Sequence, residues 1–525
     1  MEVNLIDSVH ERAVQQPERI AFEFLGKKTS YGEFDGAVAR FAYALQEHGV
    51  KRGDHVALLV GNTPHFLVTM YAAWRIGAVV VPVNPIYTAN EIAYIVQNSD
   101  ATVMVALDQL FPLFQQRQVL FPKVETLIVC ETDEASTKQC TQLEDRAYFF
   151  NDLMKVDGAV TEVLDIDKDE TAVILYTSGT SGQPKGAMLT HENVYSNARD
   201  IGVYLKMVPE DRVIATLPIF HVFALTVVVN APLLKGATII LVPKFSPKEI
   251  FRIIREEKAT VFAGVPTMYN FLYQYEDGTK EDYESIRLSI SGGASLPVAL
   301  LHNFERKFDT RISEGYGLSE ASPVTCFNPI DRERVPGSIG LSIVNVENKV
   351  VDHAGNEVPK GEVGELIVRG PNVMKGYYKL PEETAIALRD GWLYTGDMAR
   401  EDEEGYFYIV DRKKDMIIVG GFNVYPREVE EVFYEHPEVV ECAVIGVPDD
   451  DFGEQIQAYV VVKQGSDLDE EDLLAYCKKH LVKYKVPSVI HFSEELPKNA
   501  TGKILRRSLR DRVVKRIEAL REKRK

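Results

Sequence analysis

The segment YTSGTSGQPKG, residues 176–186, places three glycines, four serine or threonine hydroxyls and one lysine directly after an apolar run. Glycine permits positive φ and lets backbone N–H groups converge on an anion. Hydroxyls add further donors, and lysine adds a positive charge. The segment therefore predicts a phosphate-binding loop built from Thr177, Ser178, Gly179, Thr180, Ser181, Gly182 and Lys185.

Two common phosphate-binding motifs do not fit this segment. The Walker motif needs Ser or Thr directly after its Gly-Lys pair, whereas Pro184 precedes Lys185 and Gly186 follows it. No GxGxxG sequence opens a helix at this point, so the dinucleotide fingerprint also fails. By composition alone, a Gly/Ser-rich stretch can equally be a flexible surface loop.

The elements that must position this loop alternate between strands and helices. Over roughly the first 330 residues, apolar runs such as AVILY (172–176) alternate with amphipathic stretches such as EIFRIIREEKA (249–259). This alternation predicts an α/β fold with parallel sheets covered by helices. In it, 172–176 and 187–189 are strands, and the loop between them is a long hairpin connection. From about Gly337, short β-like segments and turns predict a smaller β-rich subdomain.

A charged run, DRKKD (411–415), separates this part from the end of the chain. Beyond it, EVEEVFYEHP predicts a helix, whereas ECAVIGV and AYVVVK predict strands. We therefore expect a large N-terminal domain over residues 1–410 and a small, mobile α+β domain over residues 411–525.

Composition excludes several classes of function. The 525 residues carry a formal charge of −19, which disfavours nucleic acid as a partner because such binding depends on basic side chains. Five cysteines without a CxxC pair indicate neither a zinc site nor a redox couple, and they are typical of a reducing cytoplasm. We find neither a signal peptide nor an apolar run long enough to span a membrane.

The glycine-rich segment and five later strings resemble the motifs of the adenylate-forming superfamily. This superfamily comprises acyl-CoA synthetases, adenylation domains of peptide synthetases, and beetle luciferases. The strings occur in the family's order and cover nearly the whole chain: SGGAS (291–295), EGYGLSEAS (314–322), GWLYTGDMA (391–399), DRKKDMIIVGGFNVYPREVE (411–430) and PKNATGKILRR (497–507). The closest resemblance is to bacterial long-chain fatty-acid–CoA ligases, which implies ATP, Mg²⁺ and coenzyme A as cofactor and co-substrates.

Joining a carboxylate to the α-phosphate of ATP brings two anions together, so the site must supply cations and oriented donors. The resemblance implies that Lys503 bridges the carboxylate and the α-phosphate. It also assigns Mg²⁺ to Glu320 with Thr177 beside it, and a carboxylate is a suitable ligand for that ion.

The nucleotide itself is assigned to further residues of the same motifs. The resemblance implies that Tyr316 stacks on adenine, and that Asp397 accepts both ribose hydroxyls with Arg412 nearby. The small residues of SGGAS allow the backbone to approach the purine. The other expected ATP-binding residues are Gly292, Gly293, Ala294, Glu314, Gly317 and Ser319.

Transfer to a thiol needs a second arrangement of the same cavity. In this family the C-terminal domain rotates about a hinge, and Lys414 occupies the matching position. Rotation would withdraw Lys503 and bring Gly420, Gly421 and Phe422 to line a tunnel for the pantetheine arm of coenzyme A.

Two residues bear on the acid that is activated. By resemblance His221 is the aromatic gate between the ATP site and the acyl channel. This role makes it a third candidate catalytic residue. Relatives that activate amino acids usually carry an aspartate at this position, so His221 argues against an amino acid as substrate. Gly315 stands where acetate-activating relatives place a tryptophan, so its missing side chain is expected to leave room for a long acyl chain. An apolar channel discriminates chain length only gradually, because each buried methylene contributes about 0.8 kcal/mol.

The expected function is therefore ATP-dependent activation of a fatty acid followed by transfer to coenzyme A. An aryl-acid (coumarate-type) CoA ligase, a luciferase-like oxygenating enzyme and a non-catalytic nucleotide-binding protein are the alternatives. A homodimer is left open.

The basic C-terminal helix has Leu509, Val513, Ile517 and Leu520 on one face. We favour docking of this face on its own domain over peripheral membrane contact.

Overall fold

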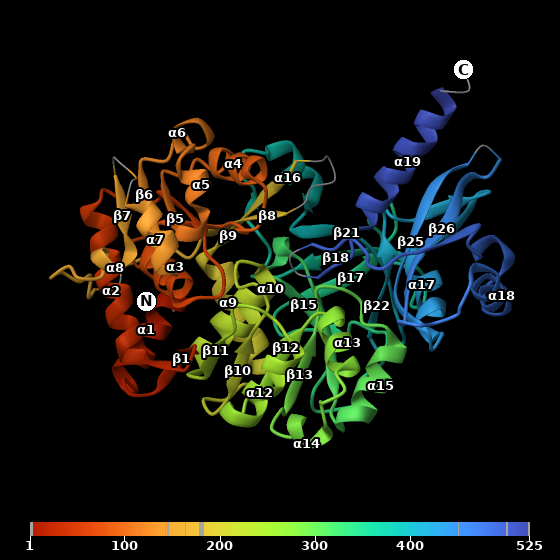
Figure 1. Cartoon of the computed structure of the whole chain (residues 1–525), viewed down its shortest axis with the longest axis horizontal. Helices are drawn as coiled ribbons and strands as arrows, with labels where there is room; N and C mark the ends of the chain where they lie inside the picture. Colours follow the sequence, from red (N-terminus) through yellow and green to blue (C-terminus); the bar gives the residue numbers. More distant parts are fainter. Residues whose placement is uncertain are drawn as a thin grey trace.

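The computed structural model describes residues 4–141, 143, 146–162, 164–177, 183–449, 451–499 and 502–522. Within these residues the strands form four sheets. Figure 1 shows the two large helix-covered sheets at the left and bottom of the molecule, and the C-terminal sheet at the right. The predicted α/β class, with parallel sheets, a β-rich part and a final α+β part, is confirmed.

One eight-stranded sheet carries the predicted phosphate-binding loop. Its central strands are parallel, whereas β8 and β9 form the predicted antiparallel hairpin in which Thr177 pairs with Lys185. A short strand, β19, pairs with β9 on its free side. In spatial order the strands are β19 (Gly376–Tyr377), β9 (Lys185–Thr190), β8 (Thr171–Thr177), β4 (Val79–Pro82), β3 (His55–Leu59), β5 (Val103–Leu107), β6 (Thr126–Cys130) and β7 (Ala147–Phe149).

A nine-stranded sheet forms the second layer. It is parallel from β1 to β14, and its two ends are antiparallel. Its spatial order is β16 (Leu341–Ser342), β15 (Val324–Phe327), β14 (Ile312–Gly317), β13 (Leu288–Ser291), β12 (Val261–Gly264), β10 (Arg212–Ala215), β11 (Thr238–Leu241), β1 (Ile20–Phe24) and β2 (Lys27–Ser30).

The largest hydrophobic core lies between these two sheets. It joins Leu58 of β3 and Val213 of β10 to apolar side chains of the helices between them. These helices are α1 (Leu5–Gln15), α2 (Tyr31–Glu47), α3 (Pro64–Arg75), α9 (His191–Tyr204) and α11 (Ala231–Lys235). Burial on both faces explains why the strands read as continuous apolar runs rather than as alternating ones.

Two further cores cover the outer faces of the sheets. The first includes α4 (Ala89–Asn98) and the short helices α5 (Phe111–Phe114), α6 (Arg117–Leu120) and α7 (Glu134–Cys140). The second includes α12 (Pro247–Glu257), α13 (Pro266–Gln274), α14 (Lys280–Tyr283) and α15 (Val298–Phe308). Two more short helices are α8 (Phe150–Leu153) and α10 (Val222–Ala224).

Helix α12 shows how local sequence specifies these elements. The side chain of Ser246 accepts a hydrogen bond from the N–H of Glu249, and Pro247 occupies the first turn, where its missing N–H costs nothing. Ile250, Phe251 and Ile254 are buried on one face. The pattern EIFRIIREEKA therefore predicted both the helix and the face that it buries.

The third and fourth sheets form the rest of the chain. The third contains β17 (Glu347–Val351), β18 (Gly364–Arg369), β20 (Leu388–Arg389), β21 (Trp392–Glu401) and β22 (Phe407–Arg412). The fourth contains β23 (Ile417–Val419), β24 (Phe422–Val424), β25 (Val439–Asp449), β26 (Gly453–Val462) and β27 (Val489–Phe492). Its helices are α17 (Pro426–Glu435), α18 (Glu470–His480) and α19 (Arg506–Glu522). Because β22 extends to Arg412, the chain leaves the third sheet two residues after the expected boundary at 410.

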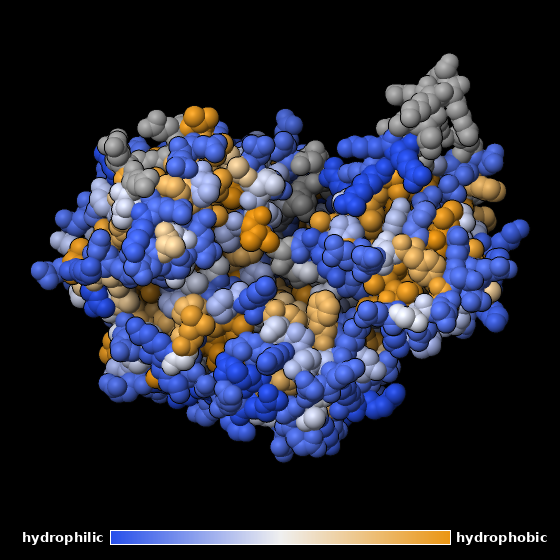
Figure 2. Space-filling view, in the orientation of Figure 1, coloured by the Kyte–Doolittle hydropathy of each residue, from blue (hydrophilic) through white to orange (hydrophobic). Residues whose placement is uncertain are grey.

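Helix α19 packs on the fourth sheet through the first half of its apolar face. Leu509 is buried with Ala443 and Ile445 of β25, and Val513 packs against the same cluster. Docking on its own domain is therefore seen for these two residues, whereas the side chains of Ile517 and Leu520 lie outside the described part. In the view of Figure 2 hydrophilic residues cover most of the molecule, and hydrophobic residues lie among them on the C-terminal part at the right. No helix in the described ranges is long and apolar enough to span a membrane.

We predict that replacing Arg506 alone destabilises the protein, because its ion pairs hold the start of α19. Arg506 donates from Nε to Glu430 Oε1 at 2.8 Å and lies 3.7 Å from Asp411 Oδ1. Arg506→Met would leave two buried carboxylates unpaired and lower the free energy of unfolding by about 2–4 kcal/mol. Urea denaturation measures this loss. Arg507→Met, which removes an exposed charge from the same turn, is the control, and equal effects of the two variants would contradict the prediction.

Candidate active site

A cavity of about 1920 Å³ opens where the third and fourth sheets meet the edges of the two large sheets. Strands β13 and β14 are parallel, and their carboxyl ends deliver Gly292 and Tyr316 to it. This is where open α/β sheets usually bind ligands, because loops from neighbouring strands diverge there.

Most of the predicted site residues line this cavity. They are Thr177, Lys185, His221, Gly292, Gly293, Ala294, Glu314, Gly315, Tyr316, Gly317, Ser319, Glu320, Asp397, Arg412, Lys414 and Lys503. Ser178, Gly179, Thr180, Ser181 and Gly182 lie outside the described residues. The apex of the predicted phosphate loop therefore stays a prediction, while both of its ends face the cavity.

The residues expected to hold adenosine lie together. The hydroxyl of Tyr316 donates a hydrogen bond to Asp397 Oδ2, and Arg412 Nε lies 3.7 Å from Asp397 Oδ1. Sheet register explains this cluster, because Asp397 of β21 pairs directly with Arg412 of β22. Asp397 is thus fixed between a hydroxyl donor and a cation, with its carboxylate facing the cavity.

On the same wall of the cavity, Gly317 allows a close backbone contact and Glu314 holds a neighbouring loop. A Cβ on Gly317 would lie 2.2 Å from the carbonyl oxygen of Pro323, so only glycine fits. Glu314 Oε1 accepts a hydrogen bond from the N–H of Leu296 at 3.0 Å, and burial raises the pKa of Glu314 to about 7. Glu314 therefore fastens the loop after β13, which includes Gly292, Gly293 and Ala294.

The expected metal ligand is held from two sides. Glu320 Oε1 accepts a hydrogen bond from the hydroxyl of Tyr377 at 2.8 Å, and its backbone carbonyl accepts one from the N–H of Met374 at 2.8 Å. Across the described chain no group of three or more His, Cys, Asp and Glu side chains is placed to hold a metal. A carboxylate and a threonine hydroxyl fit Mg²⁺, which takes few protein ligands and keeps phosphate oxygens and waters as the others.

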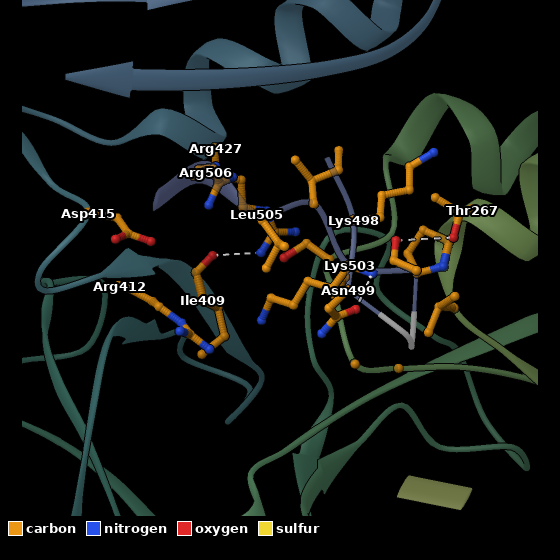
Figure 3. Close-up of a pocket in the computed structure, with 18 of the residues that line it drawn as sticks. Thr267, Ile409, Arg412, Asp415, Arg427, Lys498, Asn499, Lys503, Leu505 and Arg506 are labelled. Carbon is orange, nitrogen blue, oxygen red and sulfur yellow. Dashed lines mark hydrogen bonds between the residues drawn. The ribbon is translucent and has the colours of Figure 1, made fainter. Parts of the chain in front are cut away.

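Lys503 reaches the cavity from a loop of the C-terminal part, as Figure 3 shows, and it points to the same space as Arg412. The loop is closed by a hydrogen bond from the N–H of Lys503 to Asn499 Oδ1 at 2.9 Å. Thr267 donates to the carbonyl of Gly502 at 3.4 Å and so joins the loop to α13. Burial, reinforced by the nearby positive charge of Arg412, lowers the pKa of Lys503 to about 8.

His221 is uncharged at neutral pH. Burial, with a further contribution from the cation of Lys503, lowers the pKa of His221 to about 4. Its Nδ1 accepts a hydrogen bond from the N–H of Phe223 at 3.4 Å and so caps α10. The proton of the neutral ring therefore sits on Nε2, which leaves that nitrogen able to donate.

Gly315 lines the cavity, and its expected role in the acyl pocket stays a prediction. A Cβ on Gly315 would lie 2.2 Å from Cδ2 of Phe327. The two residues are direct partners across β14 and β15. The space opposite Gly315 is thus filled by the ring of Phe327, which also lines the cavity and was not predicted.

The three residues expected at the coenzyme A tunnel lie away from the cavity. Gly420 and Gly421 form the turn between β23 and β24, with φ of +56° and +86°, and Phe422 is the first residue of β24. Phe422 is 57% exposed and stacks on Tyr484 at a centroid distance of 4.7 Å. In this arrangement Lys503 occupies the cavity and the expected tunnel residues face solvent.

Two polar residues that contact predicted site residues were missed from the sequence. Tyr377 contacts Glu320, and Glu383 of α16 (Pro381–Ala387) forms an ion pair with Lys185. Both belong to GYYKLPEET (376–384), which lies outside the strings used for the resemblance. Their separation from Lys185 and Glu320 along the chain left no local pattern to detect.

Comparison with known proteins agrees with this geometry. Residues 9–378 match the model of the AMP-binding enzyme family, and residues 428–503 match that of the AMP-binding enzyme C-terminal domain. The chain is 41% identical to the long-chain-fatty-acid–CoA ligase of Bacillus subtilis (strain 168), over 95% of this chain and 92% of that protein. It is 37% identical to a feruloyl-CoA synthase of an Amycolatopsis species, over 95% and 97% of the two chains. The chain therefore belongs to the AMP-binding enzyme family.

Solved structures of one relative resemble this chain over nearly its whole length. The ATP-bound crystal structure of MatB from Rhodopseudomonas palustris superposes with a TM-score of 0.90 at 35% identity, covering 97% of this chain and 99% of that one. The apo structure of the same protein superposes with a TM-score of 0.78. As a whole, the chain is thus more similar to the ATP-bound structure of that protein than to its apo structure.

We predict that Gly315 cannot be enlarged without loss of stability. Gly315→Ala would force its Cβ against the ring of Phe327 and reduce the free energy of unfolding by about 1–3 kcal/mol. Urea denaturation measures this effect. In a chain that also carries Phe327→Ala, the added substitution at Gly315 should cost much less. Gly61→Ala, at a site with nothing within 4 Å of the new Cβ, is the control. An additive double variant would contradict the proposed clash.

Proposed function

We propose that this protein joins a fatty acid, with long chains preferred, to coenzyme A in two steps that share the cavity. In the first, a carboxylate oxygen attacks the α-phosphorus of ATP and pyrophosphate leaves, which forms an acyl-adenylate. In the second, the thiolate of coenzyme A attacks the acyl carbon and AMP leaves. The position of Lys503 beside Asp397 and Arg412 carries the proposal, because it supplies a cation between the ribose side and the acyl side.

Each residue then has a role in the first step. Lys503 binds the carboxylate and the α-phosphate together, while Asp397 holds the ribose and Tyr316 contacts the base. Glu320 and Thr177 hold Mg²⁺, which supplies neutralisation of the phosphate charge when bound. Neutral His221 donates from Nε2 toward the acyl side without adding a charge to an apolar wall formed by Val222, Phe223 and Ala224.

For the second step we propose that the C-terminal part rotates as a unit. The turn of residues 413–416, which includes Lys414, joins the third sheet to the fourth and is the proposed hinge. The N-terminal domain then ends at Arg412 rather than at residue 410. Rotation exposes the cavity and turns Gly420, Gly421 and Phe422 toward it.

Two classes of acid are candidate substrates. The Bacillus relative named as a long-chain-fatty-acid–CoA ligase supports a fatty acid, and the feruloyl-CoA synthase relative supports an aromatic acid as the second candidate. The five cysteines are buried and unpaired, which supports a cytoplasmic location. A homodimer stays a prediction.

We predict that CoA-dependent release of AMP and pyrophosphate is fastest with long-chain acids in a panel from acetate to oleate. Coumarate and ferulate complete the panel, and preference for either would select the second candidate. Lys503→Ala should slow acyl-adenylate formation by about 10²–10³-fold, because it removes the cation between two anions. The same variant should convert preformed acyl-adenylate to thioester at nearly the parent rate. No activity with any acid, or an unaffected variant, would refute the proposal.

The pH dependence of acyl-adenylate formation offers a further prediction. A lysine carries its charge below its pKa, so the rate should fall as pH rises through about 8, the pKa of Lys503. The arginine of Lys503→Arg keeps its charge to much higher pH, so the rate of this variant should not fall near pH 8, whatever its absolute value. Acid-dependent exchange of pyrophosphate into ATP measures both profiles. An identical alkaline limb in the two proteins would show that another group titrates.

A further inference from the structure

A short strap, residues 374–387, runs along the predicted phosphate side of the cavity. Its strand β19 pairs with β9, so that Tyr377 lies opposite Ala187, two residues from Lys185. The N–H of Tyr378 donates to the carbonyl of Gly186 at 2.8 Å. The strap is therefore fixed to the strand that begins with Lys185.

The strap places an acid directly on that lysine. Lys185 Nζ forms an ion pair with Glu383 Oε2 in the first turn of α16, and the ammonium lies 5.4 Å from the centroid of the Tyr377 ring. The side chain of Lys185 is only 12% exposed, whereas that of Glu383 is 38% exposed. The cation is thus enclosed with one carboxylate, while that carboxylate has a path to solvent.

We propose that Glu383 is a resting counter-ion of Lys185 that the phosphates of ATP displace. This inference rests on the proposed function, in which Lys185 binds phosphate. An ammonium that binds a phosphate chain cannot keep a carboxylate in the same place without bringing like charges together. Nucleotide binding at Lys185 is therefore an exchange of one anion for another. Glu383 competes with the phosphates for Lys185 and so weakens nucleotide binding.

The strap is anchored by contacts that do not involve Glu383. The hydroxyl of Thr384 accepts a hydrogen bond from the N–H of Tyr377 at 2.9 Å and donates to the carbonyl of Leu380 at 2.8 Å. Tyr378 donates to Asp100 at 2.8 Å. Since α16 is held without the ion pair, the main effect of Glu383 falls on Lys185 rather than on the helix.

The exchange also concerns the release of pyrophosphate. After the α-phosphorus has been transferred, pyrophosphate still holds the charges that contact Lys185. A carboxylate able to return to the ammonium competes with this product and favours its departure. Removing the competitor is therefore expected to strengthen the binding of both ATP and pyrophosphate.

Isothermal titration of the full chain with MgATP, and separately with pyrophosphate, tests this in the absence of acid and coenzyme A. Glu383→Gln should bind both ligands about three- to tenfold more tightly than the parent protein, as expected for loss of one partly exposed competing charge. Glu382→Gln removes the same charge from an exposed neighbour on α16 and is the matched control. It should change either dissociation constant less than twofold.

Lys185→Gln completes the experiment. It should weaken binding of both ligands, and in that background Glu383→Gln should have almost no effect, because there is no cation left to exchange. Unchanged or weaker binding by Glu383→Gln in the parent background would overturn the proposal and mean that the acid orients Lys185 for its ligand. A parent protein that binds no MgATP would overturn the proposed function as well. Thermal unfolding without ligand checks that each variant is folded.

Discussion

The arrangement of this protein depends on the placement of positive charge in a cavity that two parts of the chain build together. Lys503 from the C-terminal part faces Arg412 from the third sheet, and the charge of Arg412 helps burial to lower the pKa of Lys503. Asp397 and Asp415 offset this repulsion only in part. The cavity is therefore suited to an anionic ligand, which would satisfy both cations at once.

Strand ends in the large sheets hold several site residues, whereas a loop carries Lys503. Thr177, Tyr316 and Glu320 stand at or just beyond the ends of strands in the large sheets, where strand register and buried cores fix them. Lys503 instead lies on a loop joined to α13 by a long hydrogen bond from Thr267. Site residues on fixed strands and a lysine on a loop suit the proposed reaction, in which Lys503 is withdrawn before the second step.

Sequence patterns predicted much of this and failed for definable reasons. The apolar runs predicted the parallel sheets because both of their faces are buried, and the hairpin at 171–190 follows from two such runs separated by glycines. The contact of Gly315 with Phe327 was not predicted because a single position does not reveal its cross-strand neighbour. The pair of Lys185 and Glu383 was missed because 198 residues separate them and only the β9–β19 pairing brings them together.

Among the described residues, the contacts of the C-terminal part with the helices of the large sheets include long hydrogen bonds, such as those from Asn270 to Val440 at 3.3 Å and from Val298 to Glu431 at 3.4 Å. Shorter ones join it to β22 next to the connecting turn, where Arg427 donates to the carbonyl of Ile409 at 2.7 Å. Because the chain connects the two parts through a turn of only a few residues, each faces the other at an effective concentration in the millimolar range or above. Contacts too weak to hold two separate proteins together are then sufficient to populate a given orientation. Weak contacts are also quickly exchanged for others, so the short tether is compatible with the rotation proposed for the second step.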